Sequence, residues 1–87
     1  MIRFKLKELI SKKEFMEGRR ITLKSIAEQT GINRMTLTKI NTQPNYSTST
    51  DTLNKLCEFF NCEISELIEF IPEKKFKELQ KQQLNEK

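Results

Sequence analysis

Apolar side chains recur every three or four residues along most of the chain, which is the spacing of one face of an α-helix. This pattern predicts five helices, at about residues 4–16, 22–30, 34–41, 50–60 and 64–70. At the start of the chain, Ile2 and Phe4 alternate with a polar residue, so this stretch forms either a short strand or the lead into the first helix. The sequence therefore predicts an all-α fold, a compact five-helix domain that can include a short N-terminal strand.

The apolar face of each predicted helix defines the expected core. Outside the central helices the expected core positions are Leu6, Leu9, Ile10, Leu53, Leu56, Cys57, Phe60, Ile64, Leu67 and Ile68, with Phe15 or Met16 and Ile71 as additional candidates. Ser49 or Thr50 is expected to cap the fourth helix, and Asn61 is expected to end it in the left-handed conformation. Residues 41–48 are polar and contain a proline, which predicts a loop.

Two short helices joined by a tight turn are predicted between residues 22 and 41. Thr22 can cap the first, because its hydroxyl can accept a free backbone N–H of the first turn. Gly31 follows that helix, where a positive φ is usually needed and glycine carries no Cβ penalty. Asn33 can cap the second helix. The inward positions of the pair are Leu23, Ile26, Ala27, Thr30, Leu37 and Ile40. This is the pattern of a helix-turn-helix, whose second helix enters the DNA major groove.

The outward face of the second helix has a composition suited to base recognition. Its exposed positions are Arg34, Met35, Thr36, Thr38 and Lys39, and none of them is acidic. An arginine can bind guanine through two hydrogen bonds, and a methyl-bearing side chain can contact the methyl group of thymine. Two alternatives remain open: a small helical bundle whose exposed residues have no function, or a helix-turn-helix that serves as a protein-interaction module.

The charges are unevenly distributed along the chain. The net charge is +4, with 16 basic and 12 acidic residues. Residues 1–39 carry +6, residues 40–73 carry −5 and residues 74–87 carry +3. The half that contains the helix-turn-helix is therefore basic, as a phosphate-facing surface should be. Lysine-rich surfaces are also common for solubility alone, so charge by itself does not decide between these interpretations.

Several short segments together resemble the Cro and phage-repressor type of helix-turn-helix regulator, also called the xenobiotic-response-element family. The matching segments are Ile26-Ala27-Glu28, Thr30-Gly31-Ile32, Thr36-Leu37, Lys39-Ile40, Thr52-Leu53-Asn54-Lys55-Leu56-Cys57 and Ile64-Ser65-Glu66-Leu67-Ile68-Glu69. They cover most of residues 6–72. The resemblance implies a transcriptional regulator of bacterial or phage type that binds double-stranded DNA, and a homodimer is expected because one recognition helix contacts only a few base pairs.

The resemblance also implies roles for individual residues. The expected base contacts are Arg34, Met35, Thr36, Thr38 and Lys39. The expected phosphate contacts are Thr22, Leu23, Lys24, Asn33, Asn41, Thr42, Asn45 and Tyr46. Two positions depart from the family pattern. Many members have a phosphate-binding glutamine in place of Leu23, so Lys24 or Arg20 would have to supply that contact. Members also usually have a glycine turn after the recognition helix, which residues 41–44 lack.

Other chemistry has little support. The chain has no histidine and no glycine-rich phosphate loop, so an enzyme, a metal or a cofactor is not expected. Cys57 and Cys62 are expected to be structural thiols, and a disulfide between them stays open. No membrane-spanning run or signal peptide is present, so a cytoplasmic protein is expected and no membrane partner.

The last part of the chain differs in composition from the rest. Residues 1–72 are expected to form the DNA-binding domain and residues 73–87 a Lys/Gln-rich tail. The tail has a thin apolar stripe of Phe76, Leu79 and Leu84, typical of either a docking helix or a frayed end. A protein-interaction module, such as an antitoxin or antirepressor partner, is the alternative function. The dimer surface is expected at residues 64–71, the tail and residues 2–4.

Overall fold

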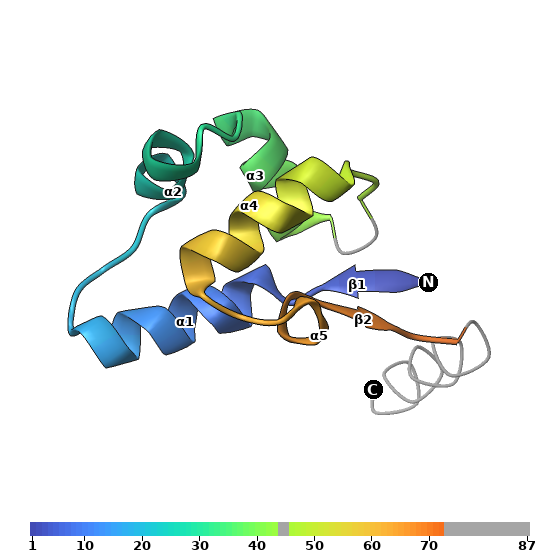
Figure 1. The fold of residues 1–87 in the computed structure, drawn as a ribbon, viewed down its shortest axis with the longest axis horizontal. Helices are drawn as coiled ribbons and strands as arrows, with labels where there is room; N and C mark the ends of the chain where they lie inside the picture. The colour runs from blue at the N-terminus through green and yellow to red at the C-terminus, as the bar shows by residue number, and fades with distance from the viewer. Residues whose placement is uncertain (44–45, 73–87) are drawn as a thin grey trace, which may run out of the picture.

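A computed structural model describes residues 1–43 and 46–72 of the chain (Figure 1). Along the sequence it consists of β1 (Ile2–Phe4), α1 (Leu6–Glu17), α2 (Leu23–Thr30), α3 (Arg34–Thr42), α4 (Thr50–Phe60), α5 (Ile64–Leu67) and β2 (Ile68–Phe70). The helices pack around one core, and the two strands form a ribbon that extends from one end of it. The predicted mostly helical domain is confirmed, and the open alternative at residues 2–4 is decided in favour of a strand.

The residues predicted to begin and end the helices do so. Thr22 Oγ1 accepts the N–H of Ser25 at 3.1 Å, and Ser49 Oγ accepts the N–H of Thr52 at 3.2 Å. The left-handed positions that end α2 and α4 are Gly31, with φ of 77°, and Asn61, with φ of 50°. These caps pair backbone groups that the helices cannot pair themselves. The boundaries of α2 and α4 therefore follow from contacts between residues that are close in sequence.

Every helix contributes to one apolar core. The buried apolar side chains are Phe4, Leu6, Leu9, Ile21, Ile26, Ile32, Leu37, Ile40, Leu56 and Leu67. Six of them, distributed over all five helices, are almost completely inaccessible to solvent. Truncating such a side chain to alanine typically costs about 2–5 kcal/mol. The orientation of α2 and α3 is therefore maintained by a core to which α1, α4 and α5 also contribute.

The ribbon joins the two ends of the described domain. β1 and β2 are antiparallel, with Ile2 opposite Phe70, Arg3 opposite Glu69 and Phe4 opposite Ile68. Arg3 Nε donates to Glu69 Oε1 at 2.6 Å. Beyond the strands, the N-terminal ammonium donates to the carbonyl of Ile71 at 2.7 Å, and the Ile71 N–H donates back to the Met1 carbonyl at the same distance.

The ribbon corrects the prediction for the fifth helix. A helix through residue 70 was expected, but α5 ends at Leu67 and the next three residues form β2. Ile68 and Phe70 are apolar and lie on either side of the charged Glu69, which is an alternation that suits a strand. β1 supplies the backbone hydrogen-bonding partners. Ile64 was expected to be buried but is 48% exposed, and Leu67 is the buried residue of this four-residue helix.

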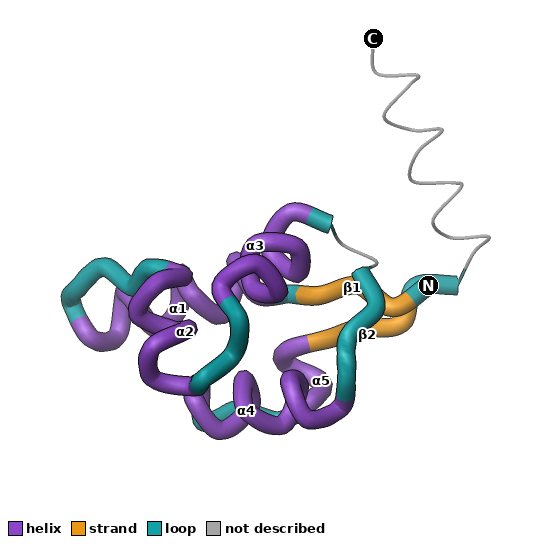
Figure 2. Tube along the Cα trace, turned by 90° about the horizontal axis from the view of Figure 1, so that it is seen from above, coloured by secondary structure: helices purple, strands orange, loops and turns teal. Residues whose placement is uncertain are grey.

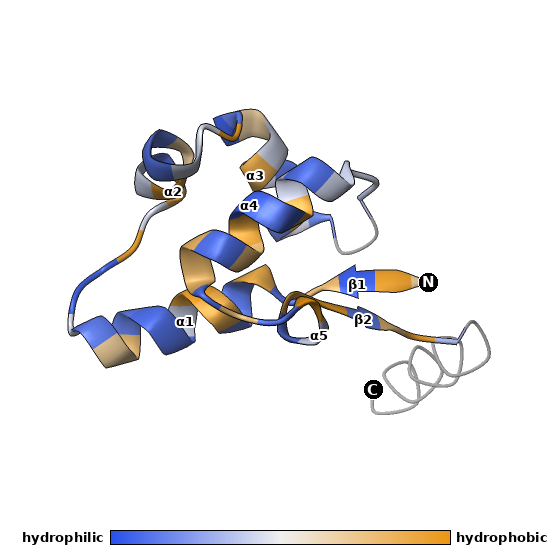
Figure 3. Ribbon diagram, viewed as in Figure 1, coloured by the Kyte–Doolittle hydropathy of each residue, from blue (hydrophilic) through white to orange (hydrophobic). Residues whose placement is uncertain are grey.

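The second half of α1 also differs from the prediction. Phe15 and Met16 were offered as core positions, but they are 90% and 74% exposed. Leu6 and Leu9 are buried near the start of the helix, whereas its C-terminal end extends past the neighbouring helices (Figure 3). Apolar spacing alone does not show where the packing partner of a helix ends. No helix in the described part of the chain is long and apolar enough to span a membrane.

Candidate nucleic-acid interface

The turn between α2 and α3 is fixed by hydrogen bonds. The Thr30 hydroxyl donates to the carbonyl of Ile26 at 2.7 Å and accepts the N–H of Ile32 at 3.2 Å. The Gly31 N–H donates to the carbonyl of Ala27 at 2.9 Å. The side chain of Ile32 is buried directly after the turn. These contacts hold the start of α3 at a defined angle to α2.

Asn33 is the N-cap of α3. Its Oδ1 accepts the N–H of Met35 at 2.8 Å. The predicted N-cap is therefore confirmed, and this hydrogen bond uses the side-chain oxygen of Asn33 as its acceptor. α3 continues to Thr42, one residue past the predicted end at about Asn41, so Asn41 and Thr42 belong to its last turn and the loop begins after them. The two residues are therefore positioned by a helix.

The predicted base-contacting residues form one surface of α3, with unequal exposure. Arg34, Met35 and Thr38 are exposed, whereas Thr36 and Lys39 are half-buried. The Thr38 hydroxyl donates to the carbonyl of Arg34 at 3.0 Å. Its proton is therefore used within the helix, and its oxygen remains an acceptor. The surface offers a guanidinium, a thioether, hydroxyls and an ammonium, and none of its residues is acidic.

Lys39 is oriented by an aromatic ring. Its Nζ lies 5.7 Å from the centroid of the Tyr46 ring, which is a cation–π distance. Tyr46 is half-buried against the core, and its N–H donates to the carbonyl of Gln43 at 3.0 Å. The loop after α3 therefore directs the ammonium of Lys39. Asn45, a predicted phosphate contact, lies outside the described residues.

A cationic hollow of about 450 Å³ lies between α1, the start of α2 and α3. Its lining includes four cationic side chains, Lys7, Arg20, Lys24 and Arg34, and the predicted phosphate contacts Thr22, Leu23 and Asn41. Within residues 1–43 and 46–72, no salt bridge involves any of the four cations. Cations that converge without neutralising partners attract an anion. We refer to this feature as the cationic hollow.

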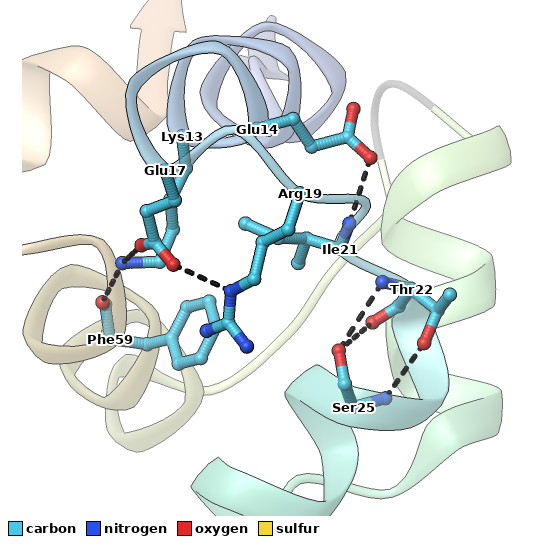
Figure 4. Close-up of polar contacts among 8 residues, drawn as sticks. All are labelled: Lys13, Glu14, Glu17, Arg19, Ile21, Thr22, Ser25 and Phe59. Carbon is cyan, nitrogen blue, oxygen red and sulfur yellow. Dashed lines mark hydrogen bonds and ion pairs between the residues drawn. The ribbon is translucent and has the colours of Figure 1, made fainter.

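The acid in the wall of the cationic hollow is occupied by the backbone. Glu14 Oε2 accepts the N–H of Ile21 at 2.8 Å (Figure 4). This contact ties α1 to the residue that precedes the α2 cap, and the Ile21 side chain is buried. The carboxylate therefore positions the start of α2 and makes no salt bridge within the described residues, although its negative charge still offsets part of the positive charge of the hollow.

A second contact holds the end of α1. Glu17 receives Lys13 Nζ at 2.7 Å on one carboxylate oxygen and Arg19 Nε at 2.9 Å on the other (Figure 4). The hydrogen bonds from Lys13 and then Arg19 lower the pKa of Glu17 below its ordinary value. Lys13 Nζ also lies 5.0 Å from the centroid of the Phe59 ring of α4. Glu17 and Arg19, which flank Gly18, are thus joined to each other, and Lys13 links this end of α1 to α4.

Asn41 has a polar atom that needs a partner. Its Oδ1 is buried, and it is the one buried side-chain oxygen or nitrogen in the described part of the chain without a hydrogen bond. A buried acceptor without a partner costs about 1–3 kcal/mol. Asn41 also contributes to the wall of the cationic hollow. A water molecule or a donor that enters with a ligand would satisfy this oxygen.

The structure adds residues to the site that the sequence did not reveal. Lys7 and Glu14 were not predicted to belong to it, and Arg20 was predicted only as a substitute contact. Lys7, Ile10 and Glu14 follow the three- and four-residue spacing of one helix face, and all three line the cationic hollow. That spacing is visible in the sequence. The position of this face beside the start of α2 depends on the packing of the whole domain.

The cysteines are not part of this site. Cys57 and Cys62 are free, half-buried thiols packed against the core. Burial and the adjacent Cys57 raise the pKa of Cys62 to about 11, so its thiol stays protonated at neutral pH. The residues that the structure describes contain no cluster of three metal-ligating side chains of the His, Cys, Asp or Glu type.

Comparison with known proteins adds one result to this geometry. A family model of the Cro/C1-type HTH DNA-binding domain matches residues 13–73. The match includes both helices of the helix-turn-helix, α4, α5 and β2. It begins inside α1, so Lys7 and β1 lie before it. No curated protein and no solved structure matches the chain.

Proposed function

The chain belongs to the Cro/C1-type helix-turn-helix DNA-binding family and is a DNA-binding regulator, and we propose that it binds a specific double-stranded sequence with α3 in the major groove. The observation that carries this proposal is the position of the cationic hollow beside the acid-free surface of α3, with Arg34 belonging to both. One surface can then contact phosphate and the next can contact bases.

Arg34 and Met35 are the principal base contacts in this proposal. They lie in the first turn of α3 and are exposed, and the N-terminal part of a recognition helix is the part that reaches base edges. Arg34 can bind guanine through two hydrogen bonds, and Met35 offers an apolar contact to thymine. Thr36, Thr38 and Lys39 follow along the groove, with Lys39 held by the Tyr46 ring.

The cationic hollow contacts the DNA backbone in this proposal. Leu23 cannot provide the phosphate hydrogen bond that a glutamine provides in many family members. Lys7, Arg20 and Lys24 surround the same place and compensate with charge. Such contacts position the protein on DNA without distinguishing sequences. The remaining proposed contacts to the DNA backbone are Thr22, Asn33, Asn41, Thr42 and Tyr46. The side chains of Thr22, Asn33 and Thr42 already make hydrogen bonds within the chain.

A homodimer completes the proposal. A single α3 contacts too few bases for useful specificity, whereas two copies related by a two-fold axis bind half-sites about 34 Å apart. The expected operator is therefore a palindrome, and residues 1–72 are proposed to be the part that binds it.

In vitro selection from random double-stranded DNA, followed by titration at several salt concentrations, tests the function directly. We expect a palindromic consensus. Arg34→Ala should weaken binding by roughly 1–3 kcal/mol for each half-site and relax one base position in each, because the variant cannot form the two hydrogen bonds to guanine. Lys12→Ala is the matched control, since Lys12 is an exposed cation that does not line the cationic hollow. Selection of no consensus, with Arg34→Ala binding like the native chain, would contradict sequence-specific recognition.

A further inference from the structure

Two hydrogen-bond acceptors belong to the wall of the cationic hollow. Asn41 Oδ1 is buried without a partner, and the residue is half-buried, so a rotation of its side chain brings this oxygen to the hollow. The second acceptor is Glu14 Oε1, because the N–H of Ile21 occupies Oε2 and no ion pair of the described residues involves Glu14 (Figure 4). The hollow therefore combines four cations with two oxygens that can accept a hydrogen bond.

The backbone of DNA matches only part of this arrangement. Its phosphates can neutralise the cations, but an internal phosphodiester and its deoxyribose carry no N–H or O–H group, because DNA lacks the 2′-hydroxyl of RNA. The negative charge of Glu14 also opposes a phosphate that lies next to it. The two acceptors are matched instead by a ligand that carries hydroxyl groups beside its phosphates.

Charge and size favour a small ligand with two phosphate groups. The four cations and Glu14 give the lining of the hollow a formal charge of +3. One phosphate monoester carries about −1.5 to −2 near neutral pH, so two of them balance the lining and one does not. The volume of about 450 Å³ lies within the range of about 300–1,000 Å³ that is usual for small-molecule sites.

The uncharged part of the lining favours a sugar over a nucleotide. It consists of Ile10, Ile21, Thr22, Leu23 and Asn41, and none of these residues is aromatic. Proteins commonly hold a nucleic-acid base by stacking it on an aromatic ring. The cationic hollow offers no such ring, whereas its cations and acceptors suit phosphates and hydroxyl groups.

The cationic hollow is separated from the acidic half of the chain. Figure 2 shows α3 and α4 on opposite sides of the domain. Among the described residues, none that belongs to α4, α5 or the two strands lines the hollow. The carboxylates of α4 and α5 therefore do not neutralise its cations. A ligand in the hollow also leaves residues 2–4 and 64–71 uncovered.

We propose that the cationic hollow binds a sugar that carries two phosphate groups, and that this ligand competes with DNA. The competition rests on the proposed function, whereas the binding of the ligand does not. Arg34 belongs both to the hollow and to the base-contacting surface of α3, so a ligand phosphate that pairs with Arg34 withdraws it from guanine. The ligand also neutralises Lys7 and Lys24, which are proposed to contact the DNA backbone. The ligand-bound chain therefore releases DNA.

Isothermal titration calorimetry on the full chain without DNA tests the site. The probes are fructose 1,6-bisphosphate and hexane-1,6-diyl bisphosphate, which has the two phosphates without the hydroxyl groups. At pH 8 neither phosphate keeps a proton to donate, because its second pKa is about 6. We expect one site that binds the sugar about tenfold more tightly, the gain from one or two hydrogen bonds. Equal affinities, or no binding of the sugar at millimolar concentration, overturn the inference.

ADP is the third probe, because a nucleotide also combines two phosphate groups with hydroxyl groups. We expect it to bind more weakly than fructose 1,6-bisphosphate, since the lining of the hollow has no aromatic side chain for the base. Tighter binding of ADP than of the sugar overturns the assignment to a sugar.

Variants locate the ligand. Lys7→Ala with Lys24→Ala should weaken both bisphosphates by about tenfold or more, whereas Lys12→Ala with Lys55→Ala, the matched control outside the hollow, should bind them like the native chain. Asn41→Leu should reduce the preference for the sugar over the alkane. This variant lacks the buried unpaired oxygen, so its melting temperature should be at least that of the native chain. Equal losses in the two lysine pairs, or an unchanged preference in Asn41→Leu, overturn the inference.

Competition is measured by fluorescence anisotropy of a labelled duplex bound to the native chain. Saturating fructose 1,6-bisphosphate should weaken DNA binding by on the order of tenfold, and DNA should weaken binding of the sugar by the same factor. Sodium sulfate at the same ionic strength is the control for screening, and an equal effect of sulfate overturns the competition. A chain that binds DNA but not the sugar overturns the inference and leaves the proposed function intact. A chain that binds the sugar but no DNA overturns the proposed function and leaves the sugar site intact.

Discussion

Two hollows of similar size have opposite chemistry. One is the cationic hollow beside the helix-turn-helix. The other, the apolar hollow, lies between the ribbon and the segment that leads into α4, and it is lined by Met1, Ile2, Phe4, Tyr46, Ser47, Thr48, Leu53 and Ile68. The cationic hollow measures about 450 Å³ and the apolar hollow about 510 Å³. Four cationic side chains line the first, whereas no charged side chain lines the second. The first therefore suits a phosphate and the second an apolar surface. Their sizes alone would not distinguish a DNA contact from a protein contact, and the difference lies in which residues line each hollow.

Reversing charge in the cationic hollow should have the largest effect. We expect Lys7→Glu with Lys24→Glu to weaken DNA binding on the order of 100-fold, equally for all sequences, because phosphate contacts carry most of the non-specific affinity. The slope of log affinity against log salt should decrease by about two for each protomer, one for each phosphate that it no longer neutralises, and so by about four for the proposed dimer. Titration by fluorescence anisotropy at several salt concentrations measures both.

The matched control for this pair is Lys12→Glu with Lys55→Glu. Lys12 is on the same helix as Lys7, and neither control residue lines the cationic hollow. A uniform loss of affinity in both double variants would show that net charge, and not this hollow, binds DNA. The two double variants should dimerise to the same extent when measured by sedimentation.

Tyr46 should have an intermediate effect, because it connects the apolar hollow to α3. Tyr46→Ala removes the ring beside Lys39 and should weaken specific DNA binding by about 0.5–1 kcal/mol, the value of an exposed cation–π contact. Tyr46→Phe keeps the ring and should bind nearly like the native chain. Equal losses in the two variants would assign the effect to the hydroxyl, as a phosphate donor, and not to the ring.

Glu17 should have the smallest effect, which is a change in stability at neutral pH that disappears in acid. The pKa of Glu17 is lower in the folded chain than its ordinary value. The ionised carboxylate therefore stabilises the fold at every pH above that ordinary pKa. This contribution disappears as the pH falls through the lowered pKa. Glu17→Gln should therefore melt at a lower temperature than the native chain at neutral pH, with a difference that decreases below about pH 4. A difference that stays constant down to about pH 2 would contradict a role for the ionised carboxylate.

Much of the helix-turn-helix was predictable because its determinants are local. The Thr22 and Asn33 caps and the positive φ of Gly31 depend on hydrogen bonds between residues a few positions apart. The exposed surface of α3 follows from the same short spacing. Tyr46 was predicted as a phosphate contact, but its packing against Lys39 depends on how the loop returns to the helix.

Local patterns along the chain were enough to predict the five helices, the caps of the central pair and the acid-free outward face of α3. Only the tertiary structure ended α5 at Leu67, because β2 is stabilised by β1 from the other end of the chain, with Arg3 and Glu69 separated by 66 positions. The packing of α1 against α3 likewise brings Lys7 and Arg34 to the wall of one hollow. Short-range hydrogen bonds specify individual elements, whereas these long-range contacts arise only when the shared core packs.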